Sequence, residues 1–218
     1  MSENLYMCFD DQQKLIPDYW TEAKVELSTR DPILADIISR NHDYTLSSRG
    51  DLFRTLIRSI VGQQISVKSA AATWCKFENK VKRITPRDIL LIPMNELKKC
   101  GLSLRKVEYI LGISRLWNSK YSNLDWFQMT DQEVIDRLLI LKGVGKWTAE
   151  MVLIFTLMRP DIFPVGDISL VRSIEEKYND KEKLSQSKLL SIGESWKPWR
   201  TVATCFIWYN DDPEPVEY

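Results

Sequence analysis

The sequence predicts an all-α protein. Apolar residues recur at three- and four-residue spacings along most of the 218 residues, and the alternation typical of β-strands is hard to find over more than a few positions. Helix starts are also marked, because Thr85-Pro86 pairs an N-cap residue with proline at the first helical position, and Thr130 with Glu133 forms a capping box. We therefore expect helices throughout.

The first half of the chain contains several predicted helices. Residues 51–79 carry the helical period, which is interrupted at Gly62 and the two glutamines that follow it. The Cys-Gly pair at 100–101 marks a helix end, and another helix runs from near Ser103 to about Trp117.

The second half predicts two helices joined by a tight turn. Thr130 begins a helix that must stop at Gly143, and the strongly apolar stretch 147–158 predicts a second helix that ends before Pro160. The arrangement is therefore helix, Gly-Val-Gly turn, helix. Asp167 then precedes a further helical pattern.

Composition excludes several classes of protein. Hydrophobic residues make up 44% of the chain and charged residues 28%, as in soluble globular proteins. No apolar run reaches the roughly 18 residues that a membrane span needs, and the N-terminus, with Glu3 and Asp10, lacks the positive region of a signal peptide. We expect no membrane partner and a reducing, cytoplasmic setting.

Cysteine and histidine usage favours carboxylate chemistry. The four cysteines lack the C-x-x-C spacing of zinc or iron–sulfur sites, so no cluster is predicted and they are interpreted as small buried hydrophobes. His42 is the only histidine, which leaves a Ser-His or Cys-His mechanism dependent on one residue. The cysteines are Cys8, Cys75, Cys100 and Cys205.

The net charge of zero conceals a basic middle. Residues 1–43 carry nine acids and four bases, which gives −5, and residues 211–218 carry four acids, which gives −4. Residues 44–210 are therefore +9. Such a segment can follow a phosphate backbone, or it can be an ordinary solvated surface of helical lysines.

The turn motif LKGVGKWTAEM, residues 141–151, can bind an anion. Gly143 and Gly145 allow positive φ and leave no side chain above the backbone, so N–H groups of the next helix can face a phosphate oxygen. An ordinary helix-helix turn uses glycine for the same steric reason. Lys146 and Thr148 beside the turn favour the phosphate interpretation.

A second motif, DIFPVGDISLVRSIEEKY at residues 161–178, places Asp167 directly before a helical pattern. One interpretation is an N-cap carboxylate that accepts backbone N–H bonds. The other is a catalytic carboxylate, and the two are compatible because the positive end of a helix stabilises an ionised side chain.

These motifs together resemble the helix-hairpin-helix DNA glycosylases over roughly residues 18–210. The resemblance implies that the glycine turn binds the DNA backbone, and that Asp167 is the catalytic aspartate. It also implies a monovalent cation, Na⁺ or K⁺, on the backbone carbonyls of Leu139, Leu141 and Val144.

Trp147 separates two reaction types within this superfamily. Enzymes that also cut the strand have a nucleophilic lysine at this position, and tryptophan cannot form a Schiff base. Lys146 lies about 100° away around the helix and is expected to face DNA or solvent. Trp147 and the segment 196–210, with Trp208, resemble the 3-methyladenine DNA glycosylase II type, in which both tryptophans stack on the base.

The segment 59–71, SIVGQQISVKSAA, resembles the loop that occupies the gap left by a flipped base. Gln64 falls at the intercalating position, with Gln63 beside it, although a polar turn between helices is the simpler interpretation. Two pocket positions that are aromatic in larger relatives are Met151 and Ile168 here, which leaves the lesion spectrum open.

The resemblance implies two helical lobes with a DNA-binding cleft. One lobe is expected from about 1–50 with 165–218, and the other from about 51–164, including the hairpin 130–158. The implied function is removal of alkylated purines (3-methyladenine, 7-methylguanine) from double-stranded DNA in base excision repair, by a monomer without strand-cleaving lyase activity or a required cofactor. The expected location is the bacterial nucleoid or the eukaryotic nucleus. Alternatives are a non-catalytic DNA-binding module and a glycosylase for another damaged base.

Overall fold

The computed structural model describes residues 16–48 and 50–212, and within these ranges every regular element is a helix. The all-α prediction is confirmed. Among the described residues, the helices are too short or too polar to cross a bilayer. The elements are α1 Trp20–Arg30, α2 Pro32–Arg40, α3 Leu52–Gly62, α4 Val67–Val81, α5 Pro86–Leu90, α6 Met94–Lys99, α7 Leu104–Lys120, α8 Asp131–Leu139, α9 Lys146–Phe155, α10 Ile168–Tyr178, α11 Gln186–Ser195 and α12 Arg200–Asp211.

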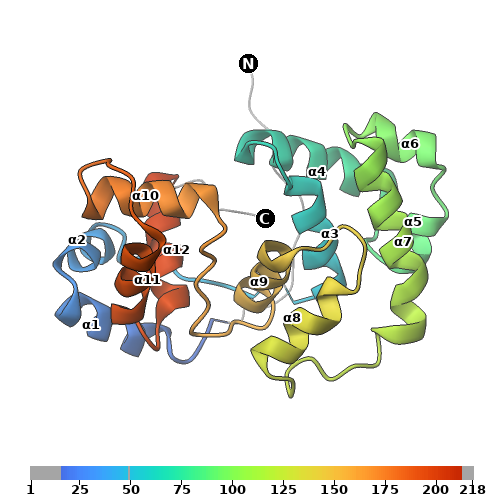
Figure 1. Ribbon diagram of the computed structural model, residues 1–218. Coiled ribbons are helices and arrows are strands. Elements are labelled where there is room, and N and C mark those ends of the chain that lie inside the picture. The colour runs from blue at the N-terminus through green and yellow to red at the C-terminus, as the bar shows by residue number, and fades with distance from the viewer. Residues whose placement is uncertain (1–15, 49, 213–218) are drawn as a thin grey trace.

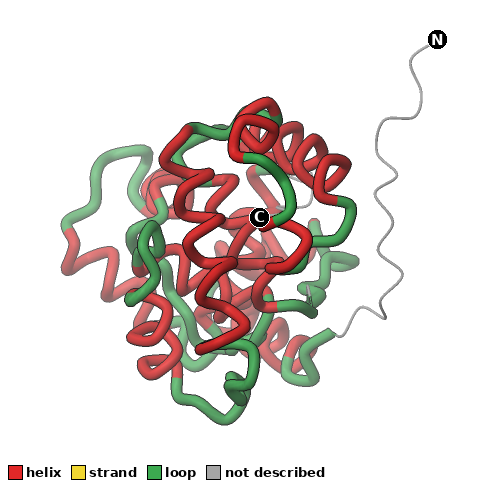
Figure 2. The backbone as a smooth tube through the Cα atoms, turned by 90° about the vertical axis from the view of Figure 1, so that its right-hand side faces the viewer, coloured by secondary structure: helices red, strands yellow, loops and turns green. Residues whose placement is uncertain are grey.

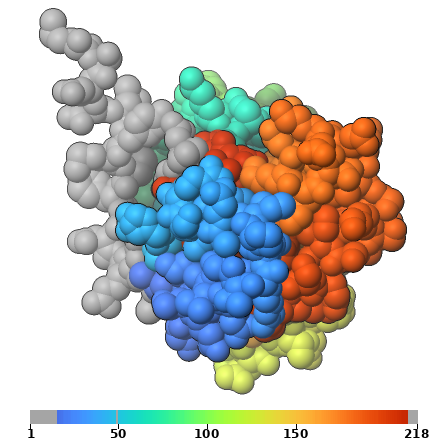
Figure 3. Space-filling model, turned by 90° about the vertical axis from the view of Figure 1, so that its left-hand side faces the viewer, coloured from blue at the N-terminus to red at the C-terminus, as the bar shows by residue number. Residues whose placement is uncertain are grey.

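The helices form two groups with α9 between them (Figure 1). In one group α12 packs against α1, α2 and α10, so the two ends of the described chain lie together. The surfaces of these segments adjoin in Figure 3, and the backbone in Figure 2 shows helices joined only by loops. In the other group α3 packs against α4, α7 and α9, and α8 also packs on α9. Helix α9 therefore carries its residues to the junction of the two groups.

Aromatic side chains build the core of the first group. Trp20 is buried and stacks on Phe206 of α12 with ring centroids 5.6 Å apart, and Tyr44 contacts both rings edge-on. Burying such rings stabilises a fold by about 2–3 kcal/mol each. The contact joins α1 to α12, which are distant in sequence.

Most predicted helix starts are confirmed by their caps. Thr130 forms the capping box with Glu133, the Thr85 side chain accepts from the Asp88 N–H, and Ser103 begins α7. Helix α11 was not predicted.

Helix α9 ends before Pro160, as predicted, but it stops at Phe155, three residues short of the end of the apolar stretch 147–158. Tertiary contacts determine this end: the Thr156 hydroxyl donates to the Thr55 hydroxyl of α3 at 2.7 Å, and the Leu157 N–H reaches the Val152 carbonyl in a wider turn.

The interpretation of the cysteines is confirmed for two of them. Cys100 and Cys205 are buried, whereas Cys75 is partly exposed because it lies toward the outer side of α4. Cys8 lies outside the described residues.

Candidate active site

Asp167 is the N-cap of α10 and is 7% exposed. Its Oδ1 accepts the Leu170 N–H at 2.8 Å and the Ser169 hydroxyl at 2.6 Å. Its Oδ2 accepts the Trp147 indole N–H at 2.7 Å. A carboxylate has about four acceptor positions, so within the described residues these donors leave one direction on Oδ2 open. The carboxylate is held in place and can still contact another molecule.

Trp147, half-buried in the first turn of α9, lies directly beside this carboxylate. The structure thus brings together two residues that lie twenty positions apart in the sequence and are predicted to share a site. Because the indole N–H donates to Asp167, Trp147 also orients the carboxylate, a role that the sequence did not indicate. Its stacking role stays a prediction.

Trp208 is placed differently from Trp147. Trp147, Met151 and Phe155 follow one another at four-residue steps along one face of α9, and Trp208 stacks on Phe155 with centroids 6.0 Å apart. Phe155 lies roughly 12 Å along the helix from Trp147. Trp208 is 6% exposed, so it belongs to the core in this structure, and a base could stack on it only after side chains move.

The two positions predicted to line the base pocket also differ from each other. Met151, on α9, is fully buried in the protein core, whereas Ile168 is 85% exposed at the first position of α10. The prediction that Ile168 lines the base pocket stays a prediction. Its exposure places an apolar side chain at the surface directly beside Asp167.

Glu150 is a buried carboxyl group that the sequence analysis missed. It lies in the second turn of α9 and is 5% exposed, with Lys146 Nζ 3.6 Å from Oε1. Burial raises the pKa of Glu150 to about 7, the Asp167 charge also raises it, and Lys146 lowers it. The signal in the sequence was a lone acid within the apolar stretch 147–158.

The hairpin turn has two glycines with different constraints. Gly143 has φ +92°, and a β-carbon there would overlap the Tyr109 ring of α7, so both backbone conformation and space require glycine. Gly145 is the N-cap of α9 without a side-chain cap, and apart from its chain neighbours none of the described residues lies within 4 Å of its β-carbon position. Gly145 therefore leaves the start of α9 uncovered, as an anion site requires. Lys146 is exposed beside it.

Gln63 and Thr148 face each other across the two turns. The Gln63 amide donates to the Gly143 carbonyl and to the Thr148 hydroxyl, both at 3.0 Å, and Thr148 is buried. The predicted wedge role of Gln63 and the predicted DNA contact of Thr148 stay predictions, and in this structure both side chains are engaged in these bonds. These two residues join the turn after α3 to the hairpin turn.

Gln64 has the geometry expected of a wedge. It is exposed and adopts φ +58°, a left-handed conformation that costs a residue with a β-carbon about 1–2 kcal/mol. Lys106 of α7 supports the same turn, because its ammonium donates to the Val61 carbonyl at 2.7 Å. The wedge role itself stays a prediction.

The predicted cation site consists of carbonyl groups only. Leu139, Leu141 and Val144 lie within the hairpin, and the Leu141 carbonyl also accepts the Val144 N–H at 3.0 Å. Among the described residues no group of three histidine, cysteine or acidic side chains could hold a metal. Uncharged oxygen donors suit a hard monovalent cation.

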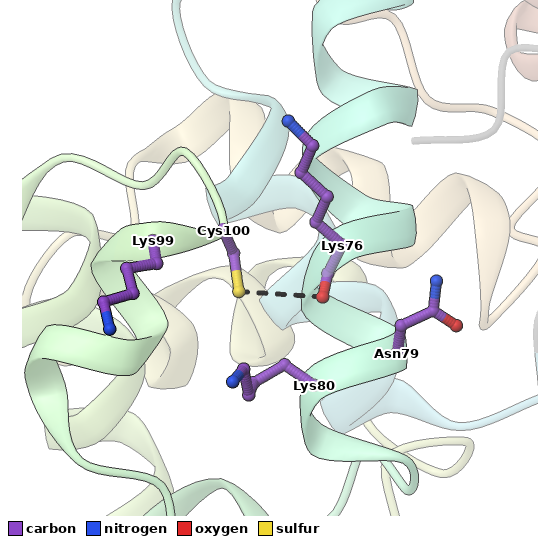
Figure 4. Close-up of a pocket in the computed structure, with 5 residues that line it drawn as sticks. All are labelled: Lys76, Asn79, Lys80, Lys99 and Cys100. Atoms are coloured by element: carbon purple, nitrogen blue, oxygen red, sulfur yellow. Dashed lines mark hydrogen bonds between the residues drawn. The ribbon is translucent and has the colours of Figure 1, made fainter.

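A separate pocket lies between α4 and the end of α6 (Figure 4). Glu96 pairs with Lys80 at 2.8 Å and with Lys99 at 2.6 Å, which offsets part of the positive charge around it. The Cys100 thiol donates to the Lys76 carbonyl at 3.6 Å. The residues that line the pocket are Lys76, Asn79, Lys80, Lys99 and Cys100.

The glycine hairpin stands directly before α9, and the buried Asp167, with one acceptor direction open, stands directly before α10, the next helix along the chain. In an all-α fold this order of elements is that of the helix-hairpin-helix class. Comparison with known proteins gives the family. The chain belongs to the HhH-GPD superfamily of base excision DNA repair proteins, whose sequence model matches residues 57–200. The predicted superfamily and fold are confirmed.

Individual relatives are 3-methyladenine glycosylases. The chain is 28% identical to the DNA-3-methyladenine glycosylase of Bacillus subtilis, with 92% of this chain and 68% of that protein covered. It is 27% identical to DNA-3-methyladenine glycosylase 1 of Schizosaccharomyces pombe, with 86% of each covered. The solved 3-methyladenine DNA glycosylase of S. pombe in complex with abasic DNA superimposes with a TM-score of 0.79 at 26% identity, over 86% of this chain and 95% of that one.

Proposed function

We propose that this protein is a monofunctional DNA glycosylase that releases alkylated purines, including 3-methyladenine and 7-methylguanine, from double-stranded DNA. The observation that carries the proposal is the Asp167 carboxylate, fixed by three donors with one acceptor direction open beside Trp147. The names of the relatives support the substrate class.

The chemistry needs little beyond a fixed negative charge. Alkylation at N3 or N7 makes the purine cationic, so when the glycosidic bond breaks its electron pair stays with the base, which leaves neutral. The deoxyribose becomes oxocarbenium-like, and an ionised Asp167 near the anomeric carbon stabilises it. Water then adds to the anomeric carbon and gives up a proton to solvent.

Trp147 supports hydrolysis without strand cleavage. A lyase needs an amine nucleophile next to the aspartate, and the α9 residue that donates to Asp167 here is a tryptophan, which carries no such amine. The neighbouring Lys146 is exposed and lies toward Glu150. Abasic strands are therefore expected to remain intact.

DNA binding is proposed to use the hairpin and the turn after α3. Phosphate oxygens meet the uncapped start of α9 at Gly145 with Lys146 beside it, and Gln64 enters the base stack where the nucleotide is extruded. A cation on the hairpin carbonyls would add positive charge to the same turn. One chain supplies all of these groups, so we propose that the active form is a monomer.

The test is release of free methylated purines from methylated duplex DNA, resolved by chromatography, with a strand-nicking assay in parallel. Asp167→Asn is compared with Asp51→Asn, a matched control because Asp51 caps α3 through the Arg54 N–H at 2.9 Å but is exposed. Release by wild type and the Asp51 variant but not by the Asp167 variant, without nicking, supports the proposal.

Three other outcomes contradict it in different ways. DNA binding without base release by wild type would favour the non-catalytic DNA-binding module. Release of oxidised or mismatched bases alone would favour a glycosylase for another kind of damage. Nicking at the abasic site would contradict the monofunctional assignment.

A further inference from the structure

Glu150 is a buried acid without a role in the chemistry above. It is 5% exposed, and its ion-pair partner is Lys146, at 3.6 Å with a side chain 66% exposed. A long contact to an exposed lysine compensates little for removing a carboxylate from water. A protein that needed only to fill this space could use an apolar side chain, as α9 does at Met151 and Leu153.

The position of Glu150 couples it to Asp167. Glu150 follows Trp147 by three residues, so it lies one turn along α9 from the indole that donates to Asp167. The two carboxyl groups also interact electrostatically, because the Asp167 charge is one of the causes that raise the pKa of Glu150. Burial is the larger cause, and together they bring this pKa to about 7.

Other charged groups on the helices that pack against α9 are directed elsewhere. On α3, Arg54 and Arg58 lie over the Trp74 ring, 5.5 Å and 5.2 Å from its centroid. On α8, Asp131 pairs with Arg159, and the remaining charged side chains are exposed: Glu133, Asp136 and Arg137. Lys146 and Asp167 are therefore the charged groups that influence the protonation state of Glu150.

We infer that Glu150 is a second charge-bearing residue of the Asp167 site, which as a carboxylate strengthens the negative potential around the deoxyribose as it becomes positive. The inference rests on the proposed glycosylase function. Glu150 acts through the protein interior without touching the sugar. A second unit charge in a partly shielded interior is expected to change the rate on the order of 10-fold.

The sign of the pH dependence follows. Below about pH 7 Glu150 is neutral and Asp167 alone stabilises the sugar; above it Glu150 is ionised and both do. Base release therefore rises with pH through a midpoint near 7.

The experiment measures single-turnover base release from one methylated duplex between about pH 5 and pH 9. Wild type is expected to gain on the order of 10-fold through the midpoint, and Glu150→Gln to lose this rise while matching wild type at low pH. The control is Glu176→Gln, which removes an exposed glutamate paired with Lys181 at 3.3 Å and keeps the rise. Because every protein acts on the same duplex, any pH dependence of the substrate itself cancels in the ratio of the variant rate to the wild-type rate.

Two further measurements separate an electrostatic role from a structural one. Lys146→Met removes the charge that lowers the pKa of Glu150, so the midpoint moves to higher pH. In Asp167→Asn the midpoint of Glu150, followed by carbon-13 NMR of labelled glutamate, moves to lower pH because a repelling charge is gone.

The outcomes are distinguishable. An unchanged pH rise in Glu150→Gln, or an NMR midpoint that does not respond to Asp167→Asn, would overturn the inference. Absence of base release by wild type would instead overturn the proposed function, and the NMR titration would still test the coupling of Glu150 to Asp167.

Discussion

Two buried aspartates begin helices in different parts of this protein, and they differ by one hydrogen bond. Asp31, the N-cap of α2, accepts two backbone N–H groups on Oδ1, and on Oδ2 the Tyr178 hydroxyl at 2.7 Å and the Trp196 indole at 3.0 Å. Asp167 accepts two donors on Oδ1 but only the Trp147 indole on Oδ2. Their exposures are nearly equal, at 8% and 7%.

The difference in donor number shows how one capping motif can either stabilise the fold alone, as at Asp31, or also leave an oxygen available, as at Asp167. All four acceptor positions of Asp31 are used by the protein, so Asp31 can only stabilise the junction of α2, α10 and the segment before α12. Asp167 accepts three donors, so one acceptor direction stays open. Burial alone does not distinguish the two residues, whereas the count of donors does.

Asp167→Asn should give the largest effect. Base release is expected to fall by about 10²–10³-fold or more because the fixed negative charge is lost. The free energy of unfolding should fall by only about 1 kcal/mol, since asparagine still caps α10. Single-turnover base release and urea unfolding measure the two. Retained base release would mean that Asp167, like Asp31, is only a cap.

Asp31→Asn should affect stability and not chemistry. The amide that replaces Oδ2 donates, and so cannot accept from the Trp196 indole, which is fully buried. We expect the free energy of unfolding to fall by about 3 kcal/mol in urea titrations. Base release by the folded fraction should stay within about twofold of wild type. A large rate loss with unchanged stability would reverse the roles assigned to the two aspartates.

The two indole donors offer a matched pair. Trp147→Phe removes a hydrogen bond to Asp167 while keeping an aromatic ring, and should lower base release about 10-fold. Trp196→Phe removes the corresponding bond to Asp31 and should cost about 1.5 kcal/mol of stability with little change in rate. If the two variants behaved alike in both assays, the open acceptor position on Asp167 would have no consequence.

The hydroxyl donors should give the smallest effects. Ser169→Ala leaves the Leu170 N–H on Oδ1, so base release should fall by only about threefold. Tyr178→Phe should reduce the free energy of unfolding by about 1 kcal/mol, measured by urea denaturation. A larger rate effect for the tyrosine variant than for the serine variant would contradict the comparison.

Features encoded by neighbouring residues were predictable from the sequence. The capping box at Thr130, the N-cap at Thr85 and the cap at Asp167 depend on side chains that bond within three residues. The resemblance then allowed Asp167 and Trp147, which lie in motifs of fixed order, to be assigned to one site.

Features that depend on partners distant in sequence were not predictable. The end of α9 depends on Thr55 of α3, and the environment of Glu150 depends on Asp167. The two adjacent glutamines look equivalent in sequence, and only the backbone turn shows that Gln63 faces the hairpin while Gln64 faces outward. The helical period likewise does not show whether Trp208 faces a pocket or Phe155.

The amide of Gln63 has a consequence for how the protein would search DNA. Through the bonds of Gln63 to Gly143 and Thr148, and through Lys106 and Tyr109 on the same side of α7, the turn after α3 and the hairpin turn are held at a fixed spacing. A duplex bound at the hairpin turn would therefore lie at a set distance from Gln64 in the turn after α3. Each binding event on DNA would then also test the stability of a base pair, and weakly stacked bases would be extruded first.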